Sequence, residues 1–224
     1  MPNSERFFCR PHLINHMFKH FAKAFPVDAI GHAAVNSSVV SDFVQTELGV
    51  KVPVEIRKFW NEQGSGYFGE RALYFFGDGS KEQPRDSLMS WNGKDFWREI
   101  YPSPREGGPV FFAETCFGDQ LGFRWEDNQC LYILFCIDTF DAFLISRDGA
   151  ELFNTILADR MSLLDEARYK SVCGHFGSLP LGMHYAPIVS PMVYGTGELE
   201  NLCLETPNVH FRTALATFKA CQSS

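Results

Sequence analysis

The sequence predicts an α+β fold in which N-terminal helices pack on a mainly antiparallel sheet, with a helical C-terminal part docked on it. The main observation is the stretch from Val110 to Ile145, where short runs rich in Phe, Tyr and Ile alternate with turn-forming residues. Such runs are typical of consecutive antiparallel strands, and several are apolar almost throughout, so we expect both faces of the sheet to be covered. Helical periodicity on both sides is the second observation. A soft boundary divides residues 1–147 from residues 148–224, and a single shared core is an open alternative.

Three helices are predicted before the sheet, because apolar residues recur there at helical spacing and are followed by Gly or preceded by Pro. Two of these helices cover residues 11–25 and 37–48, and the third begins at Pro53. The turn at residues 64–66 then leads to a strand over residues 71–76. Residues 77–86 are polar and predict a loop, and residues 89–102 predict a short helix or an irregular arm.

Three further helices are predicted after the sheet. Asp148 can cap the first of them, residues 163–176 form the second, and Thr206-Pro207 opens the last. Residues 177–197 are rich in Gly and Pro, which predicts an ordered loop with at most one short strand.

The composition is that of a soluble globular protein, with 45% hydrophobic and 21% charged residues among 224. The 22 Phe predict an aromatic core or an aromatic surface kept for a partner. No N-terminal stretch resembles a signal peptide, and the apolar run at residues 131–137 is too short to span a bilayer. Seven cysteines without close pairs favour a reducing compartment. We therefore expect a cytoplasmic protein without a membrane partner.

Negative charge is concentrated in the sheet region. Residues 110–166 contain eleven Asp and Glu against three Arg and no Lys, a balance of −8, whereas the whole chain carries −7. This balance argues against nucleic acid as a partner, because binding to phosphates depends on Lys and Arg. Acidic turns can instead attract a basic protein and raise its association rate.

Motifs for catalysis or cofactor binding are largely missing, including the phosphate-binding, zinc-protease and C-x-x-C patterns. His12, His16 and His20 could line one side of a helix and bind a metal, but the solvated edge of an amphipathic helix is the simpler interpretation. Cys116 with His175 or His210 could form a thiol and base, although a buried Cys is commoner. No cofactor, metal or catalytic residue is therefore predicted.

The carboxylates at the strand ends have two interpretations. They can be solvated turn residues, or they can form a binding face together with the aromatic residues of the arm at residues 89–102. In the alternative interpretation, the aromatic residues of this arm are buried in the core. The candidate partner-binding residues are Trp91, Asp95, Trp97, Glu126, Asp127, Asp138 and Asp141.

Several stretches, in this order along the chain, resemble one family. V-K-V-P-V-E-I-R-K-F-W-N-E-Q-G-S-G-Y-F-G at residues 50–69 resembles the opening of the SUKH superfamily and of related GAD-like domains. F-F-A-E-T-C-F-G-D at residues 111–119 resembles that group's strand and Phe-Gly-Asp turn. H-F-G-S-L-P at residues 175–180 and N-V-H-F at residues 208–211 are similar to the domain that follows GAD-like domains in type VI secretion immunity proteins. The similarity spans roughly residues 10–220.

The resemblance implies an immunity protein that binds and neutralises a bacterial toxin in the cytoplasm. A basic nuclease is the expected toxin, because an acidic face can occupy the groove that holds phosphates. The alternatives are a small hydrolase that uses carboxylates or a metal, and a SUKH-type regulatory binding module.

Overall fold

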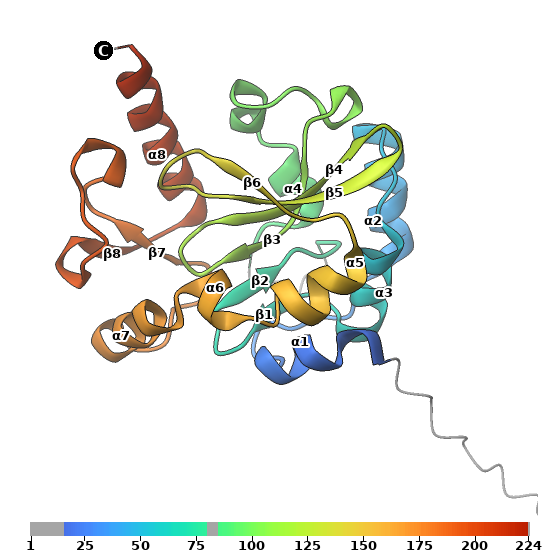
Figure 1. Cartoon of the computed structure of the whole chain (residues 1–224), viewed down its shortest axis with the longest axis horizontal. Coiled ribbons are helices and arrows are strands. Elements are labelled where there is room, and N and C mark those ends of the chain that lie inside the picture. Colours follow the sequence, from blue (N-terminus) through green and yellow to red (C-terminus); the bar gives the residue numbers. More distant parts are fainter. Residues whose placement is uncertain (1–15, 80–84, 224) are drawn as a thin grey trace, which may run out of the picture.

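The computed structural model describes residues 16–79 and 85–223. Its centre is an antiparallel sheet of six strands in the order β1-β2-β3-β4-β5-β6, so each strand pairs with its neighbours in sequence (Figure 1). The strands are β1 (Gly66–Phe68), β2 (Leu73–Phe75), β3 (Val110–Thr115), β4 (Gln120–Glu126), β5 (Gln129–Phe135) and β6 (Ala142–Ser146). A second sheet pairs β7 (His184–Pro187) with β8 (Leu202–Glu205). The predicted α+β fold is confirmed.

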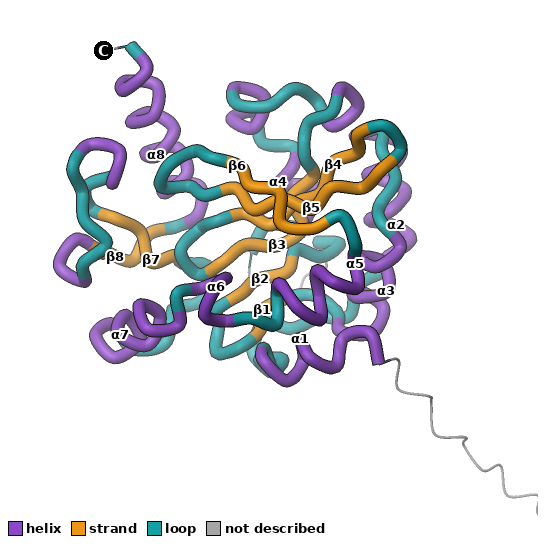
Figure 2. The backbone as a smooth tube through the Cα atoms, viewed as in Figure 1, coloured by secondary structure: helices purple, strands orange, loops and turns teal. Residues whose placement is uncertain are grey.

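Helices surround the large sheet, and Figure 2 separates them from the strands and loops. The α-helices are α1 (Lys19–Ala24), α2 (Ser37–Phe43), α3 (Val54–Gln63), α4 (Leu88–Asn92), α5 (Gly149–Glu151), α6 (Arg160–Leu164), α7 (Glu166–Phe176) and α8 (Pro207–Gln222). The other helical turns are η1 (His16–Phe18), η2 (Val44–Leu48), η3 (Asp95–Glu99), η4 (Pro104–Glu106), η5 (Leu152–Ile156), η6 (Pro191–Val193) and η7 (Leu199–Asn201). Within the described part of the chain, every helix is too short or too polar to cross a bilayer.

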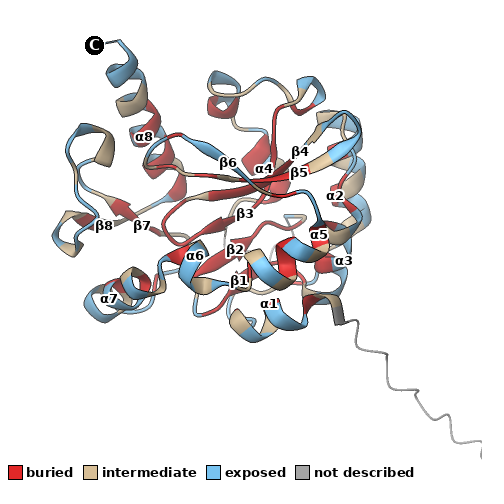
Figure 3. Ribbon diagram, in the orientation of Figure 1, coloured by how far each residue is buried: buried red, intermediate tan, exposed pale blue. Residues whose placement is uncertain are grey.

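One face of the sheet is covered by phenylalanines from the N-terminal helices and from η5. Phe75 of β2 stacks on Phe59 of α3 with ring centroids 4.2 Å apart, and Phe59 stacks on Phe153 of η5 at 4.9 Å. Phe21 of α1 packs edge-on against both Phe59 and Phe75. Residues before and after position 147 therefore meet in one buried aromatic cluster. Figure 3 colours in red the buried residues of the sheet and of the helices around it.

The opposite face of the sheet is covered by the arm between β2 and β3 and by α8. Successive strand residues point to opposite faces, so Phe111 of β3 faces this second layer. Its ring lies 4.2 Å from Trp97 of η3, and Trp97 lies 4.3 Å from Phe211 of α8. The expectation of a sheet covered on both faces is met along β2 and β3, whose residues are all buried.

Three elements differ from the sequence prediction. β1 was missed, because it has three residues and its turn into β2 uses the non-glycine residues Glu70 and Arg71 at positive φ. The single helix predicted for residues 163–176 is broken at Asp165, which adopts φ 48° and caps α7. β8 was also missed, because a four-residue strand carries too little periodicity to be read. Of the helix predicted for residues 11–25, residues 11–15 lie outside the described residues.

Candidate functional site

The predicted acidic residues do not form one face. Glu126 ends β4 and Asp127 lies in the turn from β4 to β5, whereas Asp138 and Asp141 lie in the turn between β5 and β6. Consecutive turns of an antiparallel meander lie at opposite ends of the sheet, and Figure 1 shows this arrangement. The intervening strand β5 places the two turns roughly 20 Å apart. These acids therefore do not gather on one continuous surface, because closeness in sequence is not closeness across a strand. Contact of these residues with a partner stays a prediction.

The two predicted aromatic anchors lie in the core. Trp91 and Trp97 are each 1% exposed. The indole Nε1 of Trp91 donates a hydrogen bond of 2.8 Å to Oε1 of Gln120, and Trp97 packs against the sheet. They cannot anchor a partner at the surface in this conformation, so the core-arm alternative holds for them. Asp95 begins η3 and is exposed.

The structure also places the residues considered as a thiol and its base. Cys116 is 2% exposed, and burial raises the pKa of its thiol well above the usual value, which keeps it protonated. His175 is exposed at the end of α7, and its ring packs on Phe176. His210 bonds to another histidine. The buried, protonated Cys116 fits the commoner interpretation of a core cysteine.

The histidine row is only partly visible. His12 lies outside the described residues, His16 is described only through its backbone, and His20 is exposed on α1. Among described residues, His, Cys, Asp and Glu form no group of three arranged to hold a metal ion. Metal binding by the whole row stays the untested alternative to a solvated helix edge.

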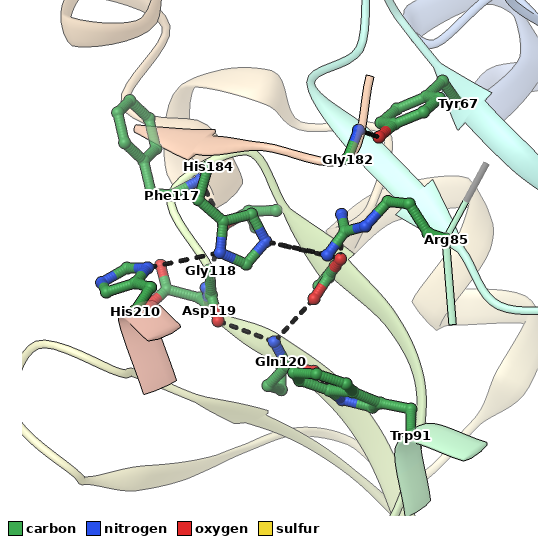
Figure 4. Close-up of polar contacts among 12 residues, drawn as sticks. Tyr67, Arg85, Trp91, Phe117, Gly118, Asp119, Gln120, Gly182, His184 and His210 are labelled. Atoms are coloured by element: carbon green, nitrogen blue, oxygen red, sulfur yellow. Dashed lines mark hydrogen bonds and ion pairs between the residues drawn. The ribbon is translucent and has the colours of Figure 1, made fainter. Parts of the chain in front are cut away.

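Sequence reasoning overlooked a buried polar network on the second face of the sheet, shown in Figure 4. Glu114 on β3 is fully buried and forms an ion pair with Arg85. Gln120 Nε2 donates to Glu114 Oε2 at 3.0 Å, and His184 Nε2 lies 3.4 Å from Glu114 Oε1. A Glu inside an apolar strand was the available signal, since a buried carboxylate requires partners.

Electrostatics inside this network keep the carboxylate charged and the histidines neutral. Burial alone would raise the pKa of Glu114, but Arg85 and His184 lower it below its usual value. Burial lowers the pKa of His184, and it lowers the pKa of His210 to about 3 with a contribution from His184. The Nδ1 atoms of the two histidines are 3.3 Å apart, which makes His184 a bridge between Glu114 and His210.

A half-buried carboxyl pair lies beside this network, with Asp119 in the β3–β4 turn and Asp138 in the β5–β6 turn. Oδ1 of Asp119 accepts a hydrogen bond of 3.0 Å from the amide of Ile137. Burial and the neighbouring Asp138 raise the pKa of Asp119 to about 6. Burial also raises the pKa of Asp138, and Arg168 opposes this shift. Asp141 in the same turn is exposed.

Several exposed apolar side chains near this end of the sheet belong to the segment of residues 188–201 between β7 and β8, which we name the C-terminal arm. Ile188 is 62% exposed, Val193 is 40% exposed and Tyr194 is fully exposed. Tyr194 adopts φ 71°, an uncommon value for a residue other than Gly, which holds its ring in solvent. Glu198 and Glu200 on the same arm are exposed.

The C-terminal arm is held in one shape by Asn201. Its side-chain Oδ1 accepts from the amide of Val189 at 2.8 Å, and its Nδ2 donates to the carbonyls of Val189 and Thr196 at 2.8 and 2.7 Å. A side chain at Gly195 would meet the carbonyl oxygen of Val189 at 1.8 Å, so Gly is required there. The arm therefore presents Tyr194 from an ordered loop.

Comparisons with known proteins give the fold alone. No family model matches the chain, and no curated protein matches it. The crystal structure of Atu4351 from Agrobacterium tumefaciens is similar to this chain, with a TM-score of 0.57 and 13% sequence identity over 88% of each chain. At this identity the likeness establishes a shared fold and carries no function.

Proposed function

We propose that this chain is an immunity protein that binds a bacterial toxin and neutralises it in the cytoplasm. The observation that carries the proposal is the C-terminal arm, where the fully exposed Tyr194 stands beside exposed Ile188 and Val193. Tyr is enriched among residues that dominate protein–protein binding, because it offers a large contact area at small entropic cost. The resemblance to immunity proteins in the sequence supports the same class.

The charge around the arm favours a basic toxin. Glu198 and Glu200 lie on the arm, and Asp141 is exposed on the nearby β5–β6 turn. The whole chain has a net charge of −7. An acidic surface competes well for a basic groove that otherwise holds phosphates, so a nuclease is the toxin class that fits. The proposed contact residues move accordingly from the buried Trp side chains to the arm.

Co-expression tests the proposal directly. The toxin encoded beside this gene is induced in cells with and without this chain, and growth and complex formation are measured. We expect growth to be rescued and both proteins to be recovered together. Growth arrest that is equal with and without this chain, with no complex recovered, would refute the proposed function.

A pair of charge reversals then locates the surface. Asp141→Lys changes the turn next to the arm, and Glu126→Lys makes the same change at the other end of the sheet, also on an exposed turn. We expect Asp141→Lys to slow association and to weaken its salt dependence, while Glu126→Lys has little effect. Equal effects of both variants would contradict binding at the arm.

A further inference from the structure

A pocket of about 400 Å³ lies beneath the C-terminal arm. That volume is within the range of about 300–1,000 Å³ for ligand sites. The pocket is enclosed by the arm, by β7 and β8, by the part of α8 from His210 to Thr217 and by the β5–β6 turn. Its lining includes Asp138, Ile188, Val189, Glu205 and His210.

The charge of the pocket is negative. Asp138 and Glu205 contribute carboxylates, and none of the described residues in its lining is Lys or Arg. Arg168 is close enough to Asp138 to lower the pKa of that carboxyl, but it lies outside the lining. Glu205 Oε1 accepts from the amide of Thr206 at 2.7 Å, which fixes its carboxylate at the start of α8.

His210 supplies an independent indication of a ligand. It is 4% exposed, lies in the pocket wall, and its Nδ1 is used by His184. Its Nε2, on the other side of the ring, has no hydrogen-bond partner among the described residues. A buried polar atom without a partner destabilises the fold, and a donor that reached this atom from the pocket would remove that cost.

The network behind His210 lets its Nε2 act as an acceptor. If Nε2–H of His184 donates to Glu114, then Nδ1 of His184 accepts from Nδ1–H of His210. His210 is then left with a lone pair on Nε2. Arg85 Nη2 lies 3.3 Å from His184 Nε2, and a bond donated by Arg85 would place the proton of His184 on Nδ1 and that of His210 on Nε2. The bound ligand decides between these two tautomer pairs. A cationic donor in the pocket selects the acceptor form.

We propose that this pocket binds the guanidinium group of an arginine side chain on the toxin, a step that deepens the proposed function and rests on it. Five N–H donors in a planar fork match two carboxylates and an imidazole acceptor better than a single ammonium does. The apolar walls accept the aliphatic stem. Ile188 and Val189 belong both to the pocket lining and to the exposed surface of the arm, so the pocket is continuous with the proposed contact surface.

The first experiment measures toxin binding by calorimetry. Asp138→Asn combined with Glu205→Gln removes both charges and keeps the shapes, including the acceptor for Thr206. The matched control is Glu126→Gln combined with Asp127→Asn at the opposite end of the sheet. We expect the pocket variant to lose at least about tenfold in affinity and the control to stay within about twofold. Wild-type affinity in the pocket variant overturns the pocket inference and leaves the proposed function standing.

The second experiment needs no toxin. Ethylguanidinium is titrated into the whole chain, and the ring nitrogens of His210 are followed by NMR. N-ethylurea is the neutral control of similar shape. We expect saturable binding of ethylguanidinium with a Kd of roughly 1 mM, a shift of His210 Nε2 toward the unprotonated form, and no response to N-ethylurea. The doubly neutralised pocket variant should not respond.

The outcomes separate the two proposals. Failure of the wild-type chain to bind any toxin, with a normal ethylguanidinium response, rejects the proposed function and assigns the pocket to a free guanidinium compound instead. No saturable response at His210, or an equal response to N-ethylurea, rejects the guanidinium site. A stronger response to ethylammonium rejects arginine in favour of lysine.

Discussion

The buried pair of Glu114 and Arg85 makes the sharpest stability prediction. Glu114 is 0% exposed and the Arg85 side chain is 4% exposed, so neither charge is solvated. Glu114→Gln leaves the guanidinium with a neutral partner inside the core. Removing one partner of such a buried pair costs about 3–5 kcal/mol, because an uncompensated charge remains. We expect a loss of that size from Glu114→Gln, and a similar loss from Arg85→Met.

The double variant Arg85→Met/Glu114→Gln removes both charges at once. Its free energy of unfolding should fall by clearly less than the sum of the two single-variant decreases, since no unpaired charge is left. Urea unfolding followed by tryptophan fluorescence measures all four free energies, and Trp91 reports on the network through its bond to Gln120. Additive losses, or a loss below about 1 kcal/mol for Glu114→Gln, would refute the claim that the pair is a coupled buried unit.

The same carboxylate predicts a pH dependence. The folded pKa of Glu114 lies below its usual value, so the folded state binds this proton less readily than the unfolded state does. Its contribution to stability is therefore present at neutral pH and is lost as the pH falls through the folded pKa. Glu114→Gln should flatten this acid limb of the stability curve. An unchanged acid limb would contradict the assignment.

Three further predictions concern other residues. The pKa of His210 is lowered to about 3. Between about pH 6.5 and 3, this group should therefore reduce the free energy of unfolding by up to about 1.4 kcal/mol per pH unit as the pH falls. In urea unfolding from pH 7 to 5, the free energy of unfolding should fall less steeply for His210→Gln than for the wild type. The pKa of Asp119 is raised to about 6, so its contribution to stability is present below about pH 4 and is lost as the pH rises through 6. The difference in stability between Asp119→Asn and the wild type should therefore shift in favour of the variant from pH 4.5 to pH 7.5. Equal differences at both pH values would be evidence against the raised pKa. Gly195→Ala should weaken toxin binding about as much as Tyr194→Ala does. The midpoint of thermal unfolding should change little in either variant, because both changes act on the C-terminal arm and spare the main core. A large fall in the midpoint for either variant would show that the arm supports the core.

Local pattern was sufficient wherever a short stretch decides its own structure. Asp148 caps its helix by accepting from the amide of Glu151, and Gly49 ends η2 with φ 75°, both as the residue types predict. The last helix begins after Thr206, as Thr206-Pro207 predicts, and it buries Phe211 and Leu215. Local pattern failed where a strand is short or a turn lacks Gly, as at Glu70, because three or four residues carry too little alternation to be recognised.

The sequence by itself determined the class of fold, the antiparallel sheet between Val110 and Ile145, and the negative charge of its turns, because alternation, turn residues and charge are local properties. Only the tertiary structure decided which residues meet. The acidic turns at either end of β5 are separated by the length of the strand, and Trp97 is enclosed because Phe211, far along the chain, packs against it. Packing and burial arise between segments that are remote in sequence, so spacing along the chain does not reveal them.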